Sequence, residues 1–299
     1  MPLASLGQML QSARSAGYAI CYCEAWNLES LQAVISAAEE LEAPVITGFN
    51  GGFLNHPERA QPEDLTAYAG LGRVALGHCR IPAALLLNET DSMKQIEAGM
   101  RLGFGGVMVE NEHLTLEEYQ LLVARVVKIA HDRNVWVEAQ LGRLPDGSGD
   151  APAELTDPAK ARAFADKTRI DALAVAVGNT HILTRGKSPI DFERLARIRD
   201  AVQVPLVLHG GSGIPLELAQ ACIQAGVAKV NFGTALKQAY LAALGEKLLN
   251  YREPMNPHPF LGMGGRADAL VAGREAVKRK VQELLKAFGS AGKGSSVLS

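Results

Sequence analysis

An eightfold alternation of short apolar runs and longer amphipathic segments constrains the fold of this chain more than any other feature. Each run is rich in β-branched or small apolar residues and is followed by polar or glycine residues and then by a segment of helical period. Near-continuous apolar strands suit a parallel sheet that is buried on both faces. The expected strands cover residues 18–23, 44–49, 83–87, 106–109, 135–139, 172–177, 205–208 and 229–232.

Helix start signals agree with this alternation. Asn27 and Thr115 each precede an amphipathic segment, and a glutamate follows Thr115 by three residues, as in a capping box. Because no linker composition interrupts the pattern, we expect one α/β domain, a (β/α)8 TIM barrel, over residues 1–288, with its last helix at about residues 273–287. The small and polar residues 289–299 have the composition of a flexible C-terminal tail.

Composition and charge narrow the possible functions. Thirty Lys and Arg residues against 32 Asp and Glu residues give a formal net charge of −2, so no global basic field is available to hold nucleic acid or an anionic membrane. The sequence has no pattern of a signal peptide or a spanning helix, and its four cysteines are too few for a disulfide scaffold. We expect a cytoplasmic protein that binds a small molecule and neither nucleic acid nor membrane.

Polar residues stand at the end of nearly every expected strand. One such residue usually caps the next helix or faces solvent. In a closed barrel, however, the carboxyl ends of all strands face one mouth, so many polar residues there indicate an active site. In chain order these residues are Glu24, Asn50, Asn88, Glu89, Glu110, Gln140, His181, His209 and Asn231.

His181 and His209 end consecutive strands, and carboxylates end others. A catalytic metal needs three protein ligands and one open position, and neutral imidazole nitrogens are common among those ligands. The two histidines are therefore the leading metal ligands. No role is assigned to the remaining histidines, which fall in loops or helical segments: His56, His78, His113, His131 and His258.

The segment after the seventh strand, residues 209–213, reads HGGSG. Consecutive glycines expose backbone N–H groups, and a helix beginning just after Gly213 would aim its positive end at the same place. A structural tight turn explains this segment alone equally well, but the polar residues after the eighth strand make a phosphorylated ligand the better interpretation, since barrels commonly hold phosphate there. The expected phosphate-binding residues are Gly210, Gly211, Ser212, Gly233 and Thr234, with Arg185 as a basic partner.

Three segments carry a family resemblance: TDPAKARAFADKTRIDALAVAVGNTH at 156–181, VPLVLHGGSGIP at 204–215 and GVAKVNFGT at 226–234. They resemble the class II, metal-dependent fructose- and tagatose-bisphosphate aldolases, and the resemblance extends over about residues 1–288. It implies a catalytic zinc ion held by three histidines and a homodimer or homotetramer. It also implies reversible aldol cleavage of a ketose (bis)phosphate through an enediolate of dihydroxyacetone phosphate.

The resemblance is uneven at the mouth of the barrel. The strand-three motif, normally His-Leu-Asp-His-Gly, is Leu86-Leu87-Asn88-Glu89-Thr90, which puts Glu89 in the place of a zinc histidine and Asn88 in the place of the proton-transferring aspartate. The other departures are Glu110-Asn111-Glu112 for Asp-Gly-Ser, Gln140 for the second carboxylate after strand five, Ile182 for a glycine, Arg185 for a lysine and Glu24 for an asparagine.

These departures have chemical consequences. Glu89, His181 and His209 would form a two-histidine, one-carboxylate site, which binds zinc and also suits manganese, iron or cobalt. Asn88 cannot transfer a proton as a carboxylic acid does, so Glu110 or Glu112 would have to replace it. The catalytic set expected at these positions is Asn88, Glu110 and Asn231, the last as a hydrogen-bond donor to the enediolate.

Three functions remain open on the sequence. The first is a metal-dependent aldolase-type lyase acting on a ketose (bis)phosphate. The second is an enzyme of the same superfamily with a changed reaction or substrate, such as an epimerase, an isomerase or an acid-sugar aldolase. The third is a catalytically inactive protein that binds sugar phosphates; a bound transition metal would count against it.

Overall fold

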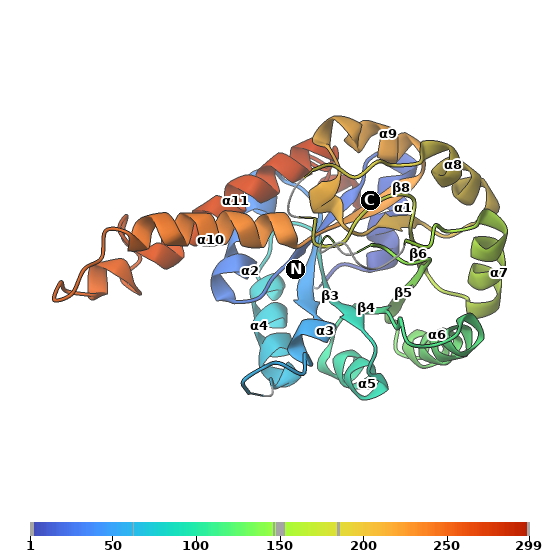
Figure 1. The fold of residues 1–299 in the computed structure, drawn as a ribbon, viewed down its shortest axis with the longest axis horizontal. Coiled ribbons are helices and arrows are strands. Elements are labelled where there is room, and N and C mark those ends of the chain that lie inside the picture. The colour runs from blue at the N-terminus through green and yellow to red at the C-terminus, as the bar shows by residue number, and fades with distance from the viewer. Residues whose placement is uncertain (1–2, 62, 146, 148–152, 184–185, 298–299) are drawn as a thin grey trace.

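A computed structural model of the protein describes residues 3–61, 63–145, 147, 153–183 and 186–297. Eight parallel strands form a closed barrel in which each strand pairs with the next and β8 pairs with β1 (Figure 1). The expected single-domain (β/α)8 barrel is therefore confirmed. The strands are β1 (Ile20–Glu24), β2 (Val45–Asn50), β3 (Ala83–Thr90), β4 (Gly106–Val109), β5 (Trp136–Leu141), β6 (Ala172–Val175), β7 (Leu206–Leu208) and β8 (Val227–Phe232).

Helices alternate with the strands and cover the outside of the barrel (Figure 1). The expected capping box of Thr115 and Glu118 is present, and the Asn27 side chain accepts from the Ser30 N–H at the start of its own helix. The α-helices are α1 (Leu6–Ala16), α2 (Leu28–Glu40), α3 (Gly51–Leu54), α4 (Leu65–Gly77), α5 (Met93–Leu102), α6 (Leu116–His131), α7 (Pro158–Thr168), α8 (Phe192–Ala201), α9 (Ala219–Gln224), α10 (Thr234–Leu248) and α11 (Ala269–Ala287).

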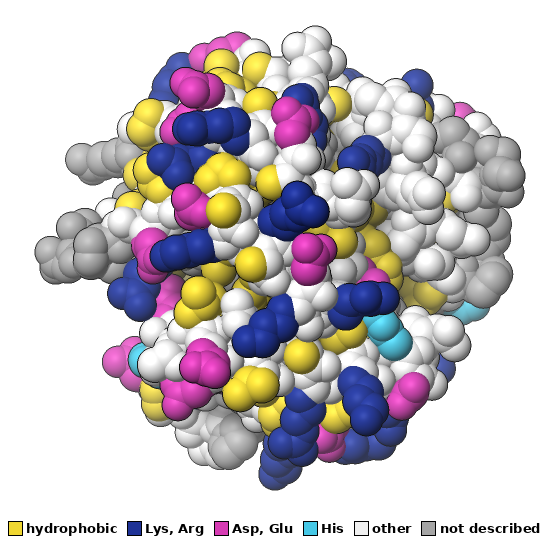
Figure 2. All heavy atoms as spheres, turned by 90° about the vertical axis from the view of Figure 1, so that its right-hand side faces the viewer, with side chains coloured by type: hydrophobic (Ala, Val, Ile, Leu, Met, Phe, Trp, Pro, Cys, Tyr) yellow, Lys and Arg dark blue, Asp and Glu magenta, His cyan; other side chains and the backbone are white. Residues whose placement is uncertain are grey.

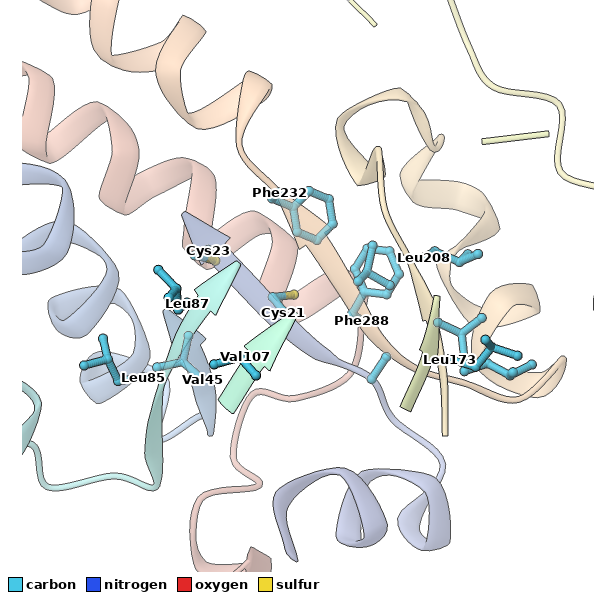
Figure 3. Packing of buried hydrophobic residues seen from close by; sticks show 14 of the residues in the cluster. Cys21, Cys23, Val45, Leu85, Leu87, Val107, Leu173, Leu208, Phe232 and Phe288 are labelled. Atoms are coloured by element: carbon cyan, nitrogen blue, oxygen red, sulfur yellow. The ribbon is translucent and has the colours of Figure 1, made fainter. Parts of the chain in front are cut away.

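Successive side chains of each strand enter two different cores, as the period of a strand requires. Cys21 and Cys23 point into the layer between strands and helices, where both thiols are buried and free, whereas Tyr22 belongs to the core inside the barrel. Figure 3 shows the outer layer, in which Phe232 and Phe288 lie 5.6 Å apart between ring centroids. The Cys-x-Cys pair of β1 is therefore a packing feature.

Helix α1 packs against the residues inside the barrel. Leu6, Met9 and Leu10 of this helix are fully or almost fully buried and share one cluster with Ile20 and Ile46, which lie at or near the starts of their strands. This packing fills the end of the barrel where the strands begin. The opposite end, where the strands finish, is consequently the end that is free to hold a site.

Helices α10 and α11 lie side by side and project beyond the barrel (Figure 1). The projection and its connecting segment, 249–268, carry several exposed apolar side chains. These are Leu241, Leu248, Leu249, Met255, Leu261 and Met263. On the face of the molecule drawn in Figure 2, by contrast, basic, acidic and apolar side chains are interspersed.

The chain continues past α11 along the barrel wall. Gly292 donates its N–H to the Leu41 carbonyl at 2.8 Å, and Gly294 donates to the Glu42 carbonyl at 2.7 Å. The division into a barrel to residue 288 and a flexible tail from residue 289 stays a prediction. Among the described residues, the longer helices lack the run of apolar residues that crossing a membrane would require.

Replacing Phe288 with alanine should lower the free energy of unfolding by about 3–5 kcal/mol, because this fully buried ring leaves a cavity against Phe232. Urea titration followed by circular dichroism measures this change. Leu121→Ala on α6 is the control: its side chain is 61% exposed, so a change within about 0.5 kcal/mol is expected. Equal effects of the two substitutions would contradict the packing described here.

Candidate active site

Glu89 stands at the carboxyl end of β3 in an unusual backbone conformation. Its φ is 51°, and the pairing register between β3 and β4 shifts between Leu87 and Thr90. Asn50 donates to Glu89 Oε2 at 2.5 Å, and Asn88 donates to Oε1 at 2.9 Å. Left-handed backbone at a residue other than glycine is costly and is found mainly where the surroundings hold it for a function. The bulge and its two amide donors thus fix the carboxylate in one direction.

Glu89, His181 and His209 come together at the mouth of the barrel. One potential ligand atom from each lies within 4.8 Å of the others, and the centroids of the two imidazole rings are 5.6 Å apart. The Nδ1 atom of His209 lies 3.2 Å from Glu89 Oε1. Two imidazole nitrogens and one carboxylate oxygen at this spacing fit a divalent transition metal. The structure thus gathers the three residues that the sequence singled out as ligands.

The other nitrogen of His209 contacts a residue that the sequence analysis missed. Nε2 lies 2.8 Å from Glu138 Oε1, and the second oxygen of Glu138 accepts from the Lys229 ammonium, also at 2.8 Å. Lys229 donates further to Asn231 Oδ1 at 2.6 Å. A carboxylate on the far nitrogen fixes the tautomer and ring orientation of a metal-binding histidine. Glu138 therefore leaves Nδ1 to face Glu89 and His181.

A signal for Glu138 and Lys229 exists in the sequence. Each is a charged residue inside an otherwise apolar strand, and each precedes by two positions a polar residue at the mouth, Gln140 or Asn231. Side chains two apart on a strand share one face, so both charges had to point into the barrel. Because an unpaired charge inside the barrel would be costly, a buried glutamate and a buried lysine are expected to form an ion pair.

Burial and hydrogen bonds shift the pKa values of His209 and Glu89 in opposite directions. Burial lowers the pKa of His209, but hydrogen bonds with Glu138 and Glu89 outweigh this and raise the pKa to about 9. Burial raises the pKa of Glu89, while the hydrogen bond with His209 and the charge of His181 lower it to about 2. An anionic Glu89 facing a proton on Nδ1 is a pair that a metal ion can join by displacing that proton.

Glu110 follows β4 and faces the same cluster. It lines a cavity of about 290 Å³ together with Glu89 and His181. Burial and then the negative charge of Glu89 raise the pKa of Glu110 to about 8. Gln140 donates to Glu110 Oε1 at 3.4 Å, while its own buried Oε1 has no hydrogen-bond partner among the described residues. Glu110 is consequently a carboxyl group that can hold its proton at neutral pH.

Asn88 and Asn231 complete the floor of the mouth. Asn88 Oδ1 accepts from Asn231 Nδ2 at 3.4 Å, and its own Nδ2 holds Glu89. Both asparagines line a second cavity, of about 420 Å³, together with Glu89 and His181. Asn88 thus acts on the orientation of Glu89.

The segments after β7 and β8 form a cradle on the wall of the 420 Å³ cavity. Gly210 has a φ of 65°, and a Cβ there would come within 2.1 Å of the Thr180 carbonyl oxygen, so only glycine fits. Ser212 Oγ accepts from the N–H of Ala235 in the first turn of α10. The cradle residues that line the cavity are Gly210, Ser212, Gly233 and Thr234.

Two expected members of this cradle differ in position. Gly211 does not line the cavity; it packs on β8, where a Cβ would lie 2.7 Å from the Asn231 carbonyl oxygen. Arg185 lies outside the described residues.

The helix expected just after Gly213 begins later. Ile214 is extended because a residue before proline is driven out of the α region; a 3₁₀ turn then covers Leu216–Leu218, and the six-residue α9 follows it directly. The helix whose N-terminus faces the cradle is α10, which starts at Thr234 after Gly233.

The fold and this cluster define a (β/α)8 enzyme barrel with a candidate metal centre beside a glycine-rich cradle. The family model for "Fructose-bisphosphate aldolase class-II" matches residues 4–293. The chain therefore belongs to the class II fructose-bisphosphate aldolase family and is an aldolase-type lyase.

Relatives agree with this assignment. The fructose-bisphosphate aldolase of Thermus caldophilus is 33% identical, covering 96% of this chain and 98% of that protein. The fructose-bisphosphate aldolase of Staphylococcus epidermidis is 32% identical over 97% and 98% of the two chains. Among solved structures, the YdjI aldolase from Escherichia coli K12 superposes with a TM-score of 0.81 at 32% identity, covering 98% of this chain and 99% of the other.

Replacing Glu138 with glutamine should weaken divalent-cation binding by about 10–100-fold. The carboxylate of Glu138 holds a proton on His209 Nε2 and so leaves Nδ1 as the metal ligand, whereas a neutral amide holds that proton less firmly. Titration of zinc against a chromophoric chelator measures the affinity, and thermal unfolding verifies that the variant is folded. Glu39→Gln, which removes a surface partner of Arg80, serves as the control and should bind zinc as the unaltered protein does. Unchanged affinity in Glu138→Gln would show that His209 is oriented without Glu138.

Proposed function

We propose that this protein is a metal-dependent aldolase that cleaves or forms a C–C bond of a ketose (bis)phosphate. One observation carries the proposal: Glu89 and His181 line the same 420 Å³ cavity as the phosphate cradle of Gly210, Ser212 and Thr234. An electrophilic centre and an anion cradle in one cavity suit a phosphorylated carbonyl substrate. The name shared by the two curated relatives, fructose-bisphosphate aldolase, supports the same substrate class.

We propose zinc as the cation held by Glu89, His181 and His209, with manganese, iron and cobalt as ions that the same donors accept. A bound cation supplies a Lewis acid that polarises the substrate carbonyl and stabilises the enediolate of dihydroxyacetone phosphate. Replacement of one imidazole by the Glu89 carboxylate adds a negative charge to the centre.

The remaining roles fall to residues of the cavity wall. Backbone N–H groups of the cradle and of the first turn of α10, with the Ser212 hydroxyl, bind the phosphate; Arg185 and Gly211 complete this set by analogy with the family. Asn231 Nδ2 is placed to donate a hydrogen bond to an enediolate oxygen, since it lines the cavity beside His209. Gly233 contributes backbone to the phosphate site at the start of α10, and its missing side chain makes room for the Glu24 carboxylate.

Proton transfer is assigned to Glu110. Asn88, at the position of the family's aspartate, donates to Glu89 and holds it in place, whereas Glu110 faces Glu89 and His181 with a raised pKa. The same substitutions favour a second candidate function, a superfamily enzyme with a changed reaction such as an epimerase, an isomerase or an acid-sugar aldolase. An inactive sugar-phosphate binder is the outcome if neither cleavage nor isomerisation is found.

Replacing Glu110 with glutamine should lower kcat for ketose phosphate cleavage by about 10²–10⁴-fold, because the amide cannot move a proton. A coupled assay of released dihydroxyacetone phosphate measures the rate. Glu117→Gln, an exposed carboxylate in the first turn of α6, is the control and should keep its kcat. A Glu110→Gln variant as active as the control would remove Glu110 from the reaction.

A homodimer or homotetramer and a cytoplasmic location complete the proposal. The exposed apolar side chains on the α10–α11 projection, such as Leu248, Leu249 and Leu261, support an interface between copies of the chain. The four cysteines are buried thiols that form no disulfide among the described residues, which supports a reducing compartment.

A further inference from the structure

A third cavity, of about 500 Å³, adjoins the candidate active site on the side of β1 and β2. It shares lining residues with the 420 Å³ cavity that holds the cradle, so the two cavities lie next to each other. The shared residues are Glu24, Asn50, Phe53, Lys237 and Leu241. A ligand seated on the cradle and at the metal cluster would extend its far end into this third cavity.

The walls of the third cavity are mainly apolar, and aromatic rings make up most of their apolar part. Trp26 contacts Tyr240 edge to face at 5.6 Å between ring centroids, and Phe49 contacts Tyr68 in the same way at 5.0 Å. A few polar groups stand among the rings: Asn27, which donates to the Tyr240 hydroxyl at 3.3 Å, is one of them. Apolar walls with a small number of placed polar groups suit a neutral ligand whose hydroxyls need only a few partners.

The two basic side chains that line the third cavity, Lys237 and Arg59, already form ion pairs with carboxylates of this chain. The Lys237 ammonium lies 2.6 Å from Glu24 Oε1, 4.3 Å from the centroid of the Phe53 ring and 5.9 Å from that of Trp26. Arg59 forms an ion pair with Glu63 and also donates to the Phe53 carbonyl at 3.1 Å. Each cation is thus neutralised by a carboxylate of this chain.

Glu24 holds Lys237 in an ion pair where the two cavities meet. Its carboxylate is almost fully buried, lines both cavities and lies so close to Gly233 that a Cβ on that glycine would come within 2.3 Å of Oε2. A second phosphate entering the third cavity would therefore have to compete with carboxylates of this chain for Lys237 and Arg59. An uncharged chain of hydroxylated carbons needs no such cation.

We propose that the third cavity binds the aldehyde fragment of the substrate and that this fragment carries no phosphate, so the substrate is a ketose 1-phosphate rather than a bisphosphate. This inference rests on the proposed aldolase function. In the cleavage direction, the C3–C4 bond breaks, the C4 hydroxyl gives its proton to the ionised form of Glu110 and becomes the aldehyde carbonyl, and the electron pair stays with C3. Transfer of that proton from Glu110 to C3 then gives dihydroxyacetone phosphate.

Competition between aldehydes in the condensation direction tests this inference. The protein is incubated with dihydroxyacetone phosphate and either glyceraldehyde 3-phosphate or unphosphorylated aldoses of three to five carbons. We expect kcat/KM for the best unphosphorylated aldose to exceed that for glyceraldehyde 3-phosphate by about tenfold or more. A preference for glyceraldehyde 3-phosphate, or no reaction of any unphosphorylated aldose, overturns the inference.

Glu24→Gln removes the charge and keeps the size of the side chain. It should raise kcat/KM for glyceraldehyde 3-phosphate by about tenfold, because the incoming phosphate then meets an amide and an unneutralised Lys237. Glu40→Gln, which removes a matched carboxylate–lysine pair with Lys278 on the surface, is the control and should leave the ratio of the two aldehydes unchanged. The same ratio in Glu24→Gln and in the control overturns the role of Glu24.

Deuterium exchange separates this inference from the function on which it rests. In D₂O without any aldehyde, an aldolase exchanges a C3 hydrogen of dihydroxyacetone phosphate, which proton NMR detects. Exchange together with a preference for the phosphorylated aldehyde would leave the proposed function standing and refute the subsite. Absence of exchange would refute the proposed function itself, and the inference with it.

Discussion

The ion pair between Glu138 and Lys229, buried inside the barrel, is the interaction on which the rest of the site depends. Loss of one partner from such a pair typically costs about 3–5 kcal/mol, because the other charge stays buried without compensation. Glu138 in turn orients His209, and His209 faces Glu89, which two asparagines hold from the other side. A chain of fixed contacts therefore runs from the barrel core to the atoms that would hold a metal.

The architecture explains why this chemistry sits at one end only. Helix α1 fills the end of the barrel where strands begin, while the strand ends bring carboxylates, imidazoles and amides from distant parts of the chain to one mouth. The first turn of α10 adds backbone N–H groups, and Ser212 is fixed against that turn through Ala235. Rigid elements thus position both halves of the site, the Glu89–His181–His209 cluster and the glycine-rich cradle.

The barrel and part of the site could be predicted from the sequence. The alternation of apolar runs with amphipathic segments predicts the barrel, and polar residues that follow the runs indicate where its active site lies. Glu89, His181 and His209 were found in that way. Glu138 and Lys229 were missed because each looks like an isolated exception inside an apolar strand, and only pairing across the barrel explains them. The helix expected directly after Gly213 does not begin there because Pro215 restricts the backbone of Ile214. Contacts between residues far apart in the chain, such as that of Glu24 with Lys237, can be identified only when the fold is known.

The central claim is that Glu89, rather than a third histidine, completes a metal centre with His181 and His209. Elemental analysis of protein purified without chelator, beside Glu89→Ala and His209→Ala variants, tests it most directly. If the centre is built as described, the unaltered protein holds close to one transition-metal ion per chain and both variants lose it. No bound metal after incubation with zinc, manganese and cobalt, or full retention in Glu89→Ala, would contradict the claim.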